Sequence, residues 1–165
     1  GAMLDEARRS NWTPRSTFRN AKQVSQAIRQ IENRTGRDAK AQEIATALGV
    51  SLDEYHRMVE SAASSRVLSY EQLAGDPERA SMLPDAPEDG PEAMLEEDQF
   101  REAVADVIAS LPERERLVLS LYYDQELNLR EIGQVLEVSE SRVCQIHGQA
   151  LIRIRARLEN WFNQE

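Results

Sequence analysis

The feature that most constrains this chain is a spacing of apolar residues that occurs twice. In residues 129–148, small Gly133 accompanies apolar residues at the positions where two short helices would meet, namely Ile132, Leu136, Val138, Val143 and Ile146. A stretch that begins at Ala41 repeats the spacing with Gly49 in the turn, and its matching residues are Ile44, Ala45, Leu48, Val50, Tyr55 and Met58. This spacing is typical of the helix-turn-helix, in which two short helices cross near a right angle over one small core. Two occurrences in one chain predict a DNA-binding protein built from several modules.

The composition favours an all-helical protein of a reducing compartment. Seven glycines, six prolines and 5% aromatic residues leave little material for sheets. The chain contains no apolar run long enough to cross a bilayer and no signal peptide, so we expect a cytoplasmic location and no membrane contact. The single cysteine, Cys144, excludes an internal disulfide network.

The net charge of -9 is concentrated in one segment. Residues 71–100 hold one basic and ten acidic residues, whereas residues 1–70 carry a net charge of +3 and residues 101–165 one of -3. Four prolines and two glycines lie between Ala74 and Glu92, where no apolar period is sustained. Such a composition cannot bury enough surface to order itself. The sequence therefore predicts an all-α fold of two small helical modules, residues 1–70 and 96–165, joined by an acidic flexible linker at 71–95.

The first module is predicted to contain three helices. One begins near Pro14 and ends at Gly36, a second covers residues 39–48, and a third is N-capped by Ser51. The first helix places basic and polar residues opposite its apolar face, and three of them are our candidates for contact with duplex backbone: Arg15, Arg19 and Lys22. An ordinary solvated face would have the same spacing, so that alternative stays open.

The second module is predicted to contain four helices, the last two N-capped by Asn128 and Ser139. The last helix runs to about Trp161, and its polar face carries arginine and glutamine, which read base edges in a major groove. Gly148 on that face would allow close approach to the DNA backbone. Residues 142–157 contain four arginines and no acid, which suits phosphate contact. We expect DNA contacts from Arg130, Ser139, Glu140, Ser141, Arg142, Gln145, Gln149 and Arg153.

No pattern in the chain predicts catalysis or metal binding. The two histidines, His56 and His147, lie in different modules and are interpreted as structural residues. Cys144 has no partner in sequence that would make it a metal ligand or a nucleophile. We therefore expect a protein that is not an enzyme and that needs no cofactor.

Several segments resemble a known family. The fourth region of bacterial RNA polymerase sigma factors is closely similar to residues 111–119 (LPERERLVL), 122–123 (YY), 127–133 (LNLREIG) and 138–143 (VSESRV). The third region of the same family resembles residues 12–16 (WTPRS), 36–37 (GR) and 54–55 (EY). The similarity is to the flagellar, motility-type alternative sigma factors. Residues 1–10 resemble the end of the family's second region, or are the remnant of a tag.

The resemblance implies a role in transcription initiation at motility and flagellar genes. Its partners would be core RNA polymerase, contacted at the flap and RNA exit region, promoter double-stranded DNA, and an anti-sigma protein. The fourth region would bind the minus-35 element, the third region would lie over the extended minus-10 segment, and the acidic connector would thread toward the active-site cleft. Because the second region that melts promoter DNA does not precede these segments, we expect this chain to be a fragment that cannot start transcription alone.

Two other functions remain open from the residues. The chain could be a stand-alone helix-turn-helix transcriptional regulator, or a protein-interaction module held by an inhibitory partner. In the isolated chain the acidic connector is expected to compete with DNA for the two basic faces, because it has no core of its own and residues 71–100 carry a net charge of -9.

Overall fold

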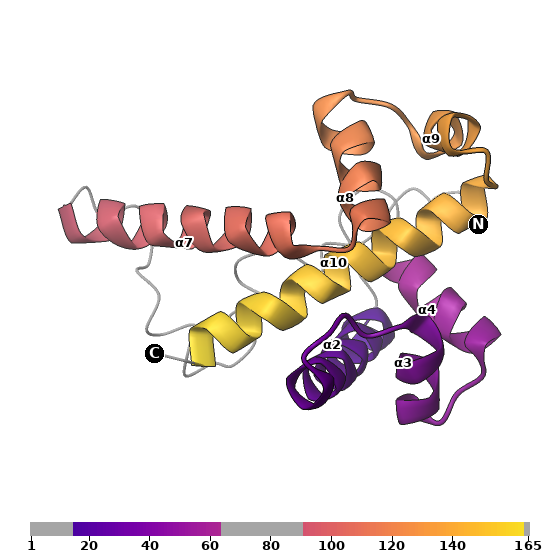
Figure 1. Ribbon diagram of the computed structural model, residues 1–165, viewed down its shortest axis with the longest axis horizontal. Coiled ribbons are helices and arrows are strands. Elements are labelled where there is room, and N and C mark those ends of the chain that lie inside the picture. Colours follow the sequence, from indigo (N-terminus) through magenta and orange to yellow (C-terminus); the bar gives the residue numbers. More distant parts are fainter. Residues whose placement is uncertain (1–14, 64–90, 164–165) are drawn as a thin grey trace.

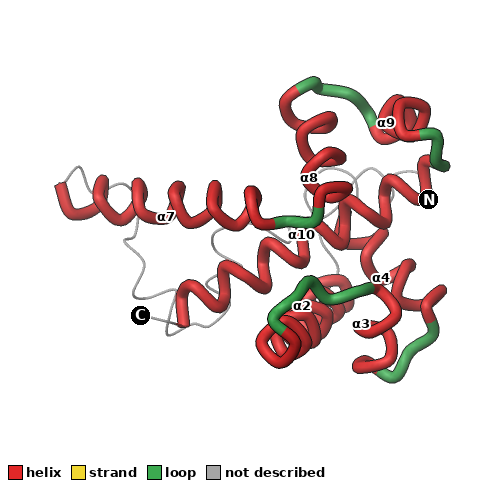
Figure 2. The backbone as a smooth tube through the Cα atoms, in the orientation of Figure 1, coloured by secondary structure: helices red, strands yellow, loops and turns green. Residues whose placement is uncertain are grey.

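The computed structural model describes residues 15–63 and 91–163, and every regular element within these two ranges is a helix (Figure 1). The predicted all-α class is therefore confirmed. Short connections separate the consecutive helices of each range (Figure 2). The helices are α2 (Arg15–Thr35), α3 (Ala41–Leu48), α4 (Leu52–Ala63), α7 (Pro91–Ser110), α8 (Glu113–Leu119), the π-helical turn η1 (Ser120–Asp124), α9 (Leu129–Leu136) and α10 (Glu140–Asn163).

The three N-terminal helices lie close to their predicted positions, and local capping interactions define their ends. Gly36 and Gly49 end α2 and α3 in the left-handed region, with φ values of 70° and 71°, which glycine adopts without strain. The Ser51 hydroxyl accepts a hydrogen bond from the Glu54 amide at 3.1 Å and so caps α4. The second helix starts at Ala41 rather than Ala39, because Lys40 keeps an extended backbone at the N-cap position.

The first helix of the C-terminal half begins earlier than predicted. Helix α7 starts at Pro91, inside the stretch 71–95 that the sequence assigned to a flexible linker. Proline is favourable at the first helical position because its φ is already helical and its missing N–H is not needed there. Residues 71–90 of the predicted linker lie outside the described residues, so that part stays a prediction.

Helix α10 is the axis of the molecule. It runs diagonally between α2–α4 on one side and α7–α9 on the other, and it contacts both groups (Figure 1). Between Val143 and Leu158 all of its side chains are buried or half-buried. A helix that is covered on all sides belongs to the centre of a core, not to a surface.

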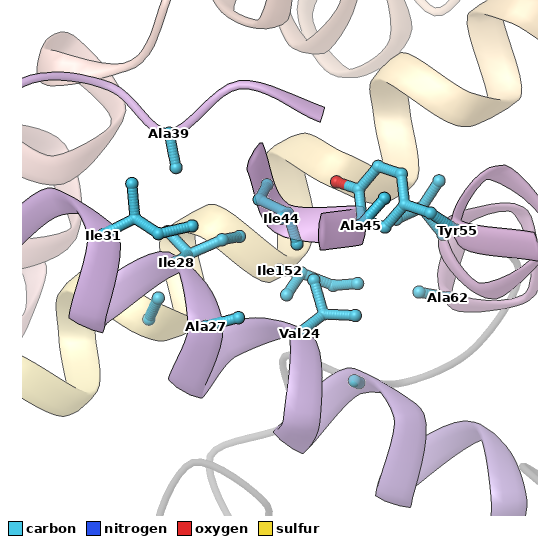
Figure 3. Packing of buried hydrophobic residues seen from close by; sticks show 13 residues of the cluster. Val24, Ala27, Ile28, Ile31, Ala39, Ile44, Ala45, Tyr55, Ala62 and Ile152 are labelled. Atoms are coloured by element: carbon cyan, nitrogen blue, oxygen red, sulfur yellow. The ribbon is translucent and has the colours of Figure 1, made fainter. Parts of the chain in front are cut away.

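The two predicted modules share one of the hydrophobic cores. Ile152 and Ala156 of α10 lie in the same buried cluster as the apolar face of α2 and the inward residues of α3 and α4. Figure 3 shows Ile152 among Val24, Ile28 and Ile44. Full burial of a side chain such as Ile152 stabilises the contact by roughly 1.5–3 kcal/mol. The arrangement therefore joins the modules through apolar packing that their separate sequences did not reveal.

Gly148 allows close approach of two helix backbones in this junction. A Cβ atom at Gly148 would overlap the carbonyl oxygen of Val59 in α4 and lie only 2.6 Å from the Val59 carbonyl carbon. From the sequence, Gly148 was expected to allow close approach to the DNA backbone. In the structure the backbone that it admits is that of α4.

Candidate nucleic-acid interface

The helix-turn-helix of the C-terminal half has the expected geometry. Asn128 caps α9. Its side-chain oxygen accepts a hydrogen bond from the Glu131 backbone amide at 2.8 Å, and its backbone amide donates one to the Glu131 carboxylate at 3.0 Å. A side chain at Gly133 would meet the Val138 carbonyl oxygen at 2.8 Å, so the small residue is required where the turn folds back. Val118, Ile132, Val143 and Ile146 form the shared core of this unit.

The start of α10 is open to solvent. The Ser139 hydroxyl caps the helix by accepting from the Arg142 amide at 3.1 Å. Four candidate residues at this end are exposed: Ser139, Glu140, Ser141 and Arg142. Arg130, at the start of α9, is exposed as well. Unpaired backbone N–H groups and the helix dipole make such an N-terminus favourable for phosphate, and Arg142 adds a cation beside it. Glu140 at the same end opposes this effect.

Farther along α10, the two candidate glutamines are occupied by other parts of the chain. The Gln145 amide donates to the Glu60 carboxylate of α4 at 2.8 Å. The Gln149 side chain accepts from the Tyr55 hydroxyl at 2.7 Å and donates to Glu115 at 3.3 Å. Neither side chain is free to read a base edge in this arrangement.

Arg153 is enclosed completely. Its side chain is 1% exposed, and its Nε donates to Glu115 at 3.0 Å while its Nη1 donates to Glu32 of α2 at 2.6 Å. Its Nη2 donates to the Ala39 carbonyl oxygen at 2.9 Å. Burial alone would lower the pKa of Arg153, but the carboxylates of Glu115 and Glu32 outweigh it and raise that pKa. In this arrangement Arg153 is a structural cation, and DNA cannot reach it.

Arg157 extends the same cluster of charges. It donates to Glu32 at 3.1 Å, to Asp38 at 2.7 Å and to the Ser110 carbonyl oxygen at 2.9 Å. Arg155 pairs with Glu159 at 2.9 Å. Of the four arginines whose run suggested phosphate contact, only Arg142 lacks an ion pair within the described residues.

The basic stripe of α2 is partly retained on the surface. Arg19 and Lys22 are exposed, as a backbone contact would require. The side chain of Arg15 lies outside the described residues. Arg29, farther along the same face, is half-buried and pairs with Glu159 of α10 at 3.6 Å.

His147 and Cys144 occupy structural positions. His147 is 2% exposed, lies 3.3 Å from the Tyr123 hydroxyl through Nε2, and has its pKa lowered by burial. The Cys144 thiol is half-buried 3.7 Å from the Glu60 carbonyl oxygen, and burial raises its pKa, which makes it a poor nucleophile. Within the part of the chain that the structure describes, no three His, Cys, Asp or Glu side chains converge on a metal site, and no helix there is long and apolar enough to span a bilayer.

Sequence reasoning missed the acidic partners of α10. Glu32, Glu60 and Glu115 contact its polar groups from three different helices. Only Glu115 carried a local signal, because it lies one turn from buried positions of α8, and it proves to be buried.

Comparison with known proteins agrees with this geometry. Residues 19–95 match the family described as Sigma-70 region 3, and residues 107–156 match Sigma-70 region 4. The chain is 52% identical to the RNA polymerase sigma factor FliA of Pseudomonas aeruginosa, covering 98% of this chain and 66% of that protein. It is 46% identical to FliA of Yersinia enterocolitica, covering 97% of this chain and 70% of the relative.

A more distant sequence relative and a solved structure belong to the same group. The sigma-D factor of Bacillus subtilis is 34% identical over 96% of this chain and 64% of its own length. The crystal structure of a flagellar sigma/anti-sigma complex, Sigma-28/FlgM, contains a chain 29% identical, with a TM-score of 0.50 over 97% of this chain and 66% of that one. The present chain thus spans about two thirds of the length of these relatives. It belongs to the sigma-70 family of RNA polymerase sigma factors and contains that family's third and fourth regions.

Proposed function

We propose that this chain is the promoter-recognition part of a flagellar-type sigma factor, which directs core RNA polymerase to promoters of motility genes. The single observation that carries the proposal is the solvent-open start of α10 in a helix-turn-helix, with Arg142 beside a capped helix N-terminus. The family membership assigns that helix to the fourth region.

The residues predicted to contact DNA fall into two groups, one for each of two promoter segments. Arg130, Ser139, Ser141 and Arg142 would bind the minus-35 duplex, and Gln145, Gln149 and Arg153 would join them only after α10 is uncovered. Arg19 and Lys22, with Arg15, would contact backbone near the extended minus-10 segment. A cation that contacts phosphate contributes affinity without reading sequence, whereas Arg142 in a major groove could do both.

The protein partners that we propose for this chain are core RNA polymerase and an anti-sigma protein. Exposed apolar side chains on α7, α8, η1 and α9 suit a protein contact, namely Ile108, Leu117, Tyr123 and Val135. The structural relative is a flagellar sigma factor held by an anti-sigma protein, which supports a partner of that kind here. The proposed place of action is the cytoplasm, where polymerase and promoters meet, and the proposal requires no cofactor and no catalysis.

The proposal is tested with a duplex that carries the upstream element of a flagellar promoter. Fluorescence anisotropy should show tighter binding to this duplex than to a scrambled duplex at the same salt concentration. Equal affinity for the two duplexes, with and without core polymerase, would contradict the proposal. A stand-alone regulator gains no support, because the relatives described above are sigma factors.

A further inference from the structure

A cavity of about 320 Å³ opens where the connection between α2 and α3 meets α4, α8 and α10. Its lining combines apolar groups, among them Ala41, Pro112 and Ile146, with several charged side chains. Pockets that hold small molecules have volumes from roughly 300 Å³ upward and a largely apolar lining with a few polar groups. The cavity is therefore large enough for a small ligand, and its charged side chains indicate which kind.

The charge of the lining is positive. Three cations line the cavity, namely Lys40, Arg142 and Arg153, against two acids, Asp38 and Glu115, on a chain whose overall charge is -9. Both acids are already neutralised, because Asp38 accepts from Arg157 at 2.7 Å and Glu115 accepts from Arg153 at 3.0 Å. The acids of the lining are thus held within the protein and are not free to bind a cation.

Two of the cations are not neutralised in this way. Lys40 and Arg142 are exposed, and neither forms an ion pair with any residue that the structure describes. Glu43, three residues after Lys40, is held instead by Arg37 at 2.7 Å. The Nη1 group of Arg142 donates to the neutral side chain of Gln145 at 3.4 Å. Unpaired cations beside a cavity favour an anionic ligand there.

The charge of this pair of cations matches phosphate better than carboxylate. A phosphate monoester carries close to two negative charges at neutral pH and three strong acceptor oxygens, so that it can neutralise both cations. A carboxylate carries one charge and would leave one cation unpaired. Arginine binds phosphate through two parallel hydrogen bonds and lysine through its point charge. We propose that this cavity binds a small phosphate-bearing anion, with Lys40 and Arg142 as the cations that hold it.

This site gives Arg142 a second role, and that part of the proposal rests on the proposed function. Arg142 is the exposed arginine that we propose for contact with the minus-35 duplex. A phosphate in the cavity and a phosphate of DNA would compete for the same guanidinium group. The ligand should therefore weaken binding of the duplex, whereas its own binding requires no DNA.

Isothermal titration calorimetry of the full chain tests the site without DNA. The probes are inorganic phosphate, ribose 5-phosphate and adenosine monophosphate, with ribose as the uncharged control, all at constant ionic strength. We expect saturable one-to-one binding of at least one phosphate-bearing probe and none of ribose. The tightest probe shows whether the occupant is free phosphate or a phosphorylated small molecule. Failure of all three phosphate probes to saturate the chain at millimolar concentrations would overturn the proposal.

Variants locate the binding at the cavity. Arg142→Gln and Lys40→Gln should each weaken the tightest probe about tenfold, because each removes one charge-assisted contact with phosphate. Arg114→Gln, which alters an exposed arginine of α8 outside the lining, is the matched control and should bind like the parent. Circular dichroism shows that each variant folds. Unchanged binding in both cavity variants, or equal weakening in the control, would overturn the site.

Anisotropy on the flagellar promoter duplex tests the competition. At about ten times its dissociation constant, the tightest probe should weaken duplex binding by the parent up to about tenfold, and that by Arg142→Gln much less. If the probe binds but duplex affinity is unchanged, the shared use of Arg142 is wrong. If the parent does not bind the duplex at all, the proposed promoter role fails instead, while calorimetry still decides whether the phosphate site exists.

Discussion

Replacement of Arg153 by methionine separates a structural role from a role in DNA contact. Methionine retains most of the aliphatic volume, so the change chiefly removes the guanidinium group. Among the described residues, Glu115, 4% exposed, would then keep only the Gln149 amide at 3.3 Å, whereas Glu32 would still pair with Arg157. Removing one partner of a buried ion pair costs about 3–5 kcal/mol, because the other charge remains buried without compensation.

Urea unfolding followed by circular dichroism measures this loss. With a denaturant slope typical of a chain this size, the expected cost lowers the midpoint by roughly 1–2 M. Arg153→Met combined with Glu115→Met should recover most of the stability, because both buried charges are then gone. Arg130→Met, which alters an exposed arginine of α9, should stay within about 0.5 kcal/mol of the parent. An Arg153→Met chain as stable as that control would refute the buried-cation assignment.

Three further predictions concern DNA and pH. Arg142→Ala should weaken binding to the promoter duplex by about 1–3 kcal/mol in an anisotropy titration, and unchanged affinity with an intact fold would exclude a direct contact. Replacing Arg15, Arg19 and Lys22 together by glutamine should flatten the slope of log affinity against log salt by up to about three phosphate equivalents, whereas an unchanged slope would show the stripe to be solvated only. Burial lowers the pKa of His147 below its ordinary 6.5. The His147 imidazole therefore binds a proton more readily in the unfolded chain than in the folded one. Stability should therefore be full above pH 6.5 and fall on acidification below it, and His147→Gln should reduce this dependence in urea titrations across that range.

Local chemistry made the helices predictable from the sequence. Two glycines end helices through their backbone conformation, and two polar residues cap helices through their side chains: Gly36 and Gly49, and Asn128 and Ser139. Their effect does not depend on distant residues. The apolar spacing around Gly133 likewise defined the helix-turn-helix, because both of its helices lie within one short window.

The union of the two modules was not predictable in this way. Arg153 meets Glu115 and Glu32 across 38 and 121 residues of sequence, and no local period encodes such pairs. Gln145 and Gln149 have the same appearance in a sequence whether their amides face DNA or a neighbouring helix. Gly148 signalled a close approach correctly, but a glycine does not identify the backbone that approaches it.

Only the start of the predicted DNA-binding face of α10 is exposed among the described residues. Arg142 lies at the open start of α10, whereas Gln145, Gln149 and Arg153 contact α2 or α4. A duplex can therefore first engage the start of the helix, and contact with all the predicted DNA-binding residues of α10 requires α2–α4 to move away from it. Bound DNA should shift the equilibrium toward the open arrangement in proportion to its preference for that state.

The most direct test is a titration with the flagellar promoter duplex of a chain spin-labelled at Ala47→Cys in α3 and Gln134→Cys in α9, in a Cys144→Ser background; both label positions are exposed. We predict that the distance between α3 and α9 lengthens as the duplex saturates the chain, and that an equal concentration of scrambled duplex leaves that distance short in most molecules. Saturation with the promoter duplex while the short distance persists would contradict this prediction, because the chain would then bind DNA with α10 still covered by α2–α4.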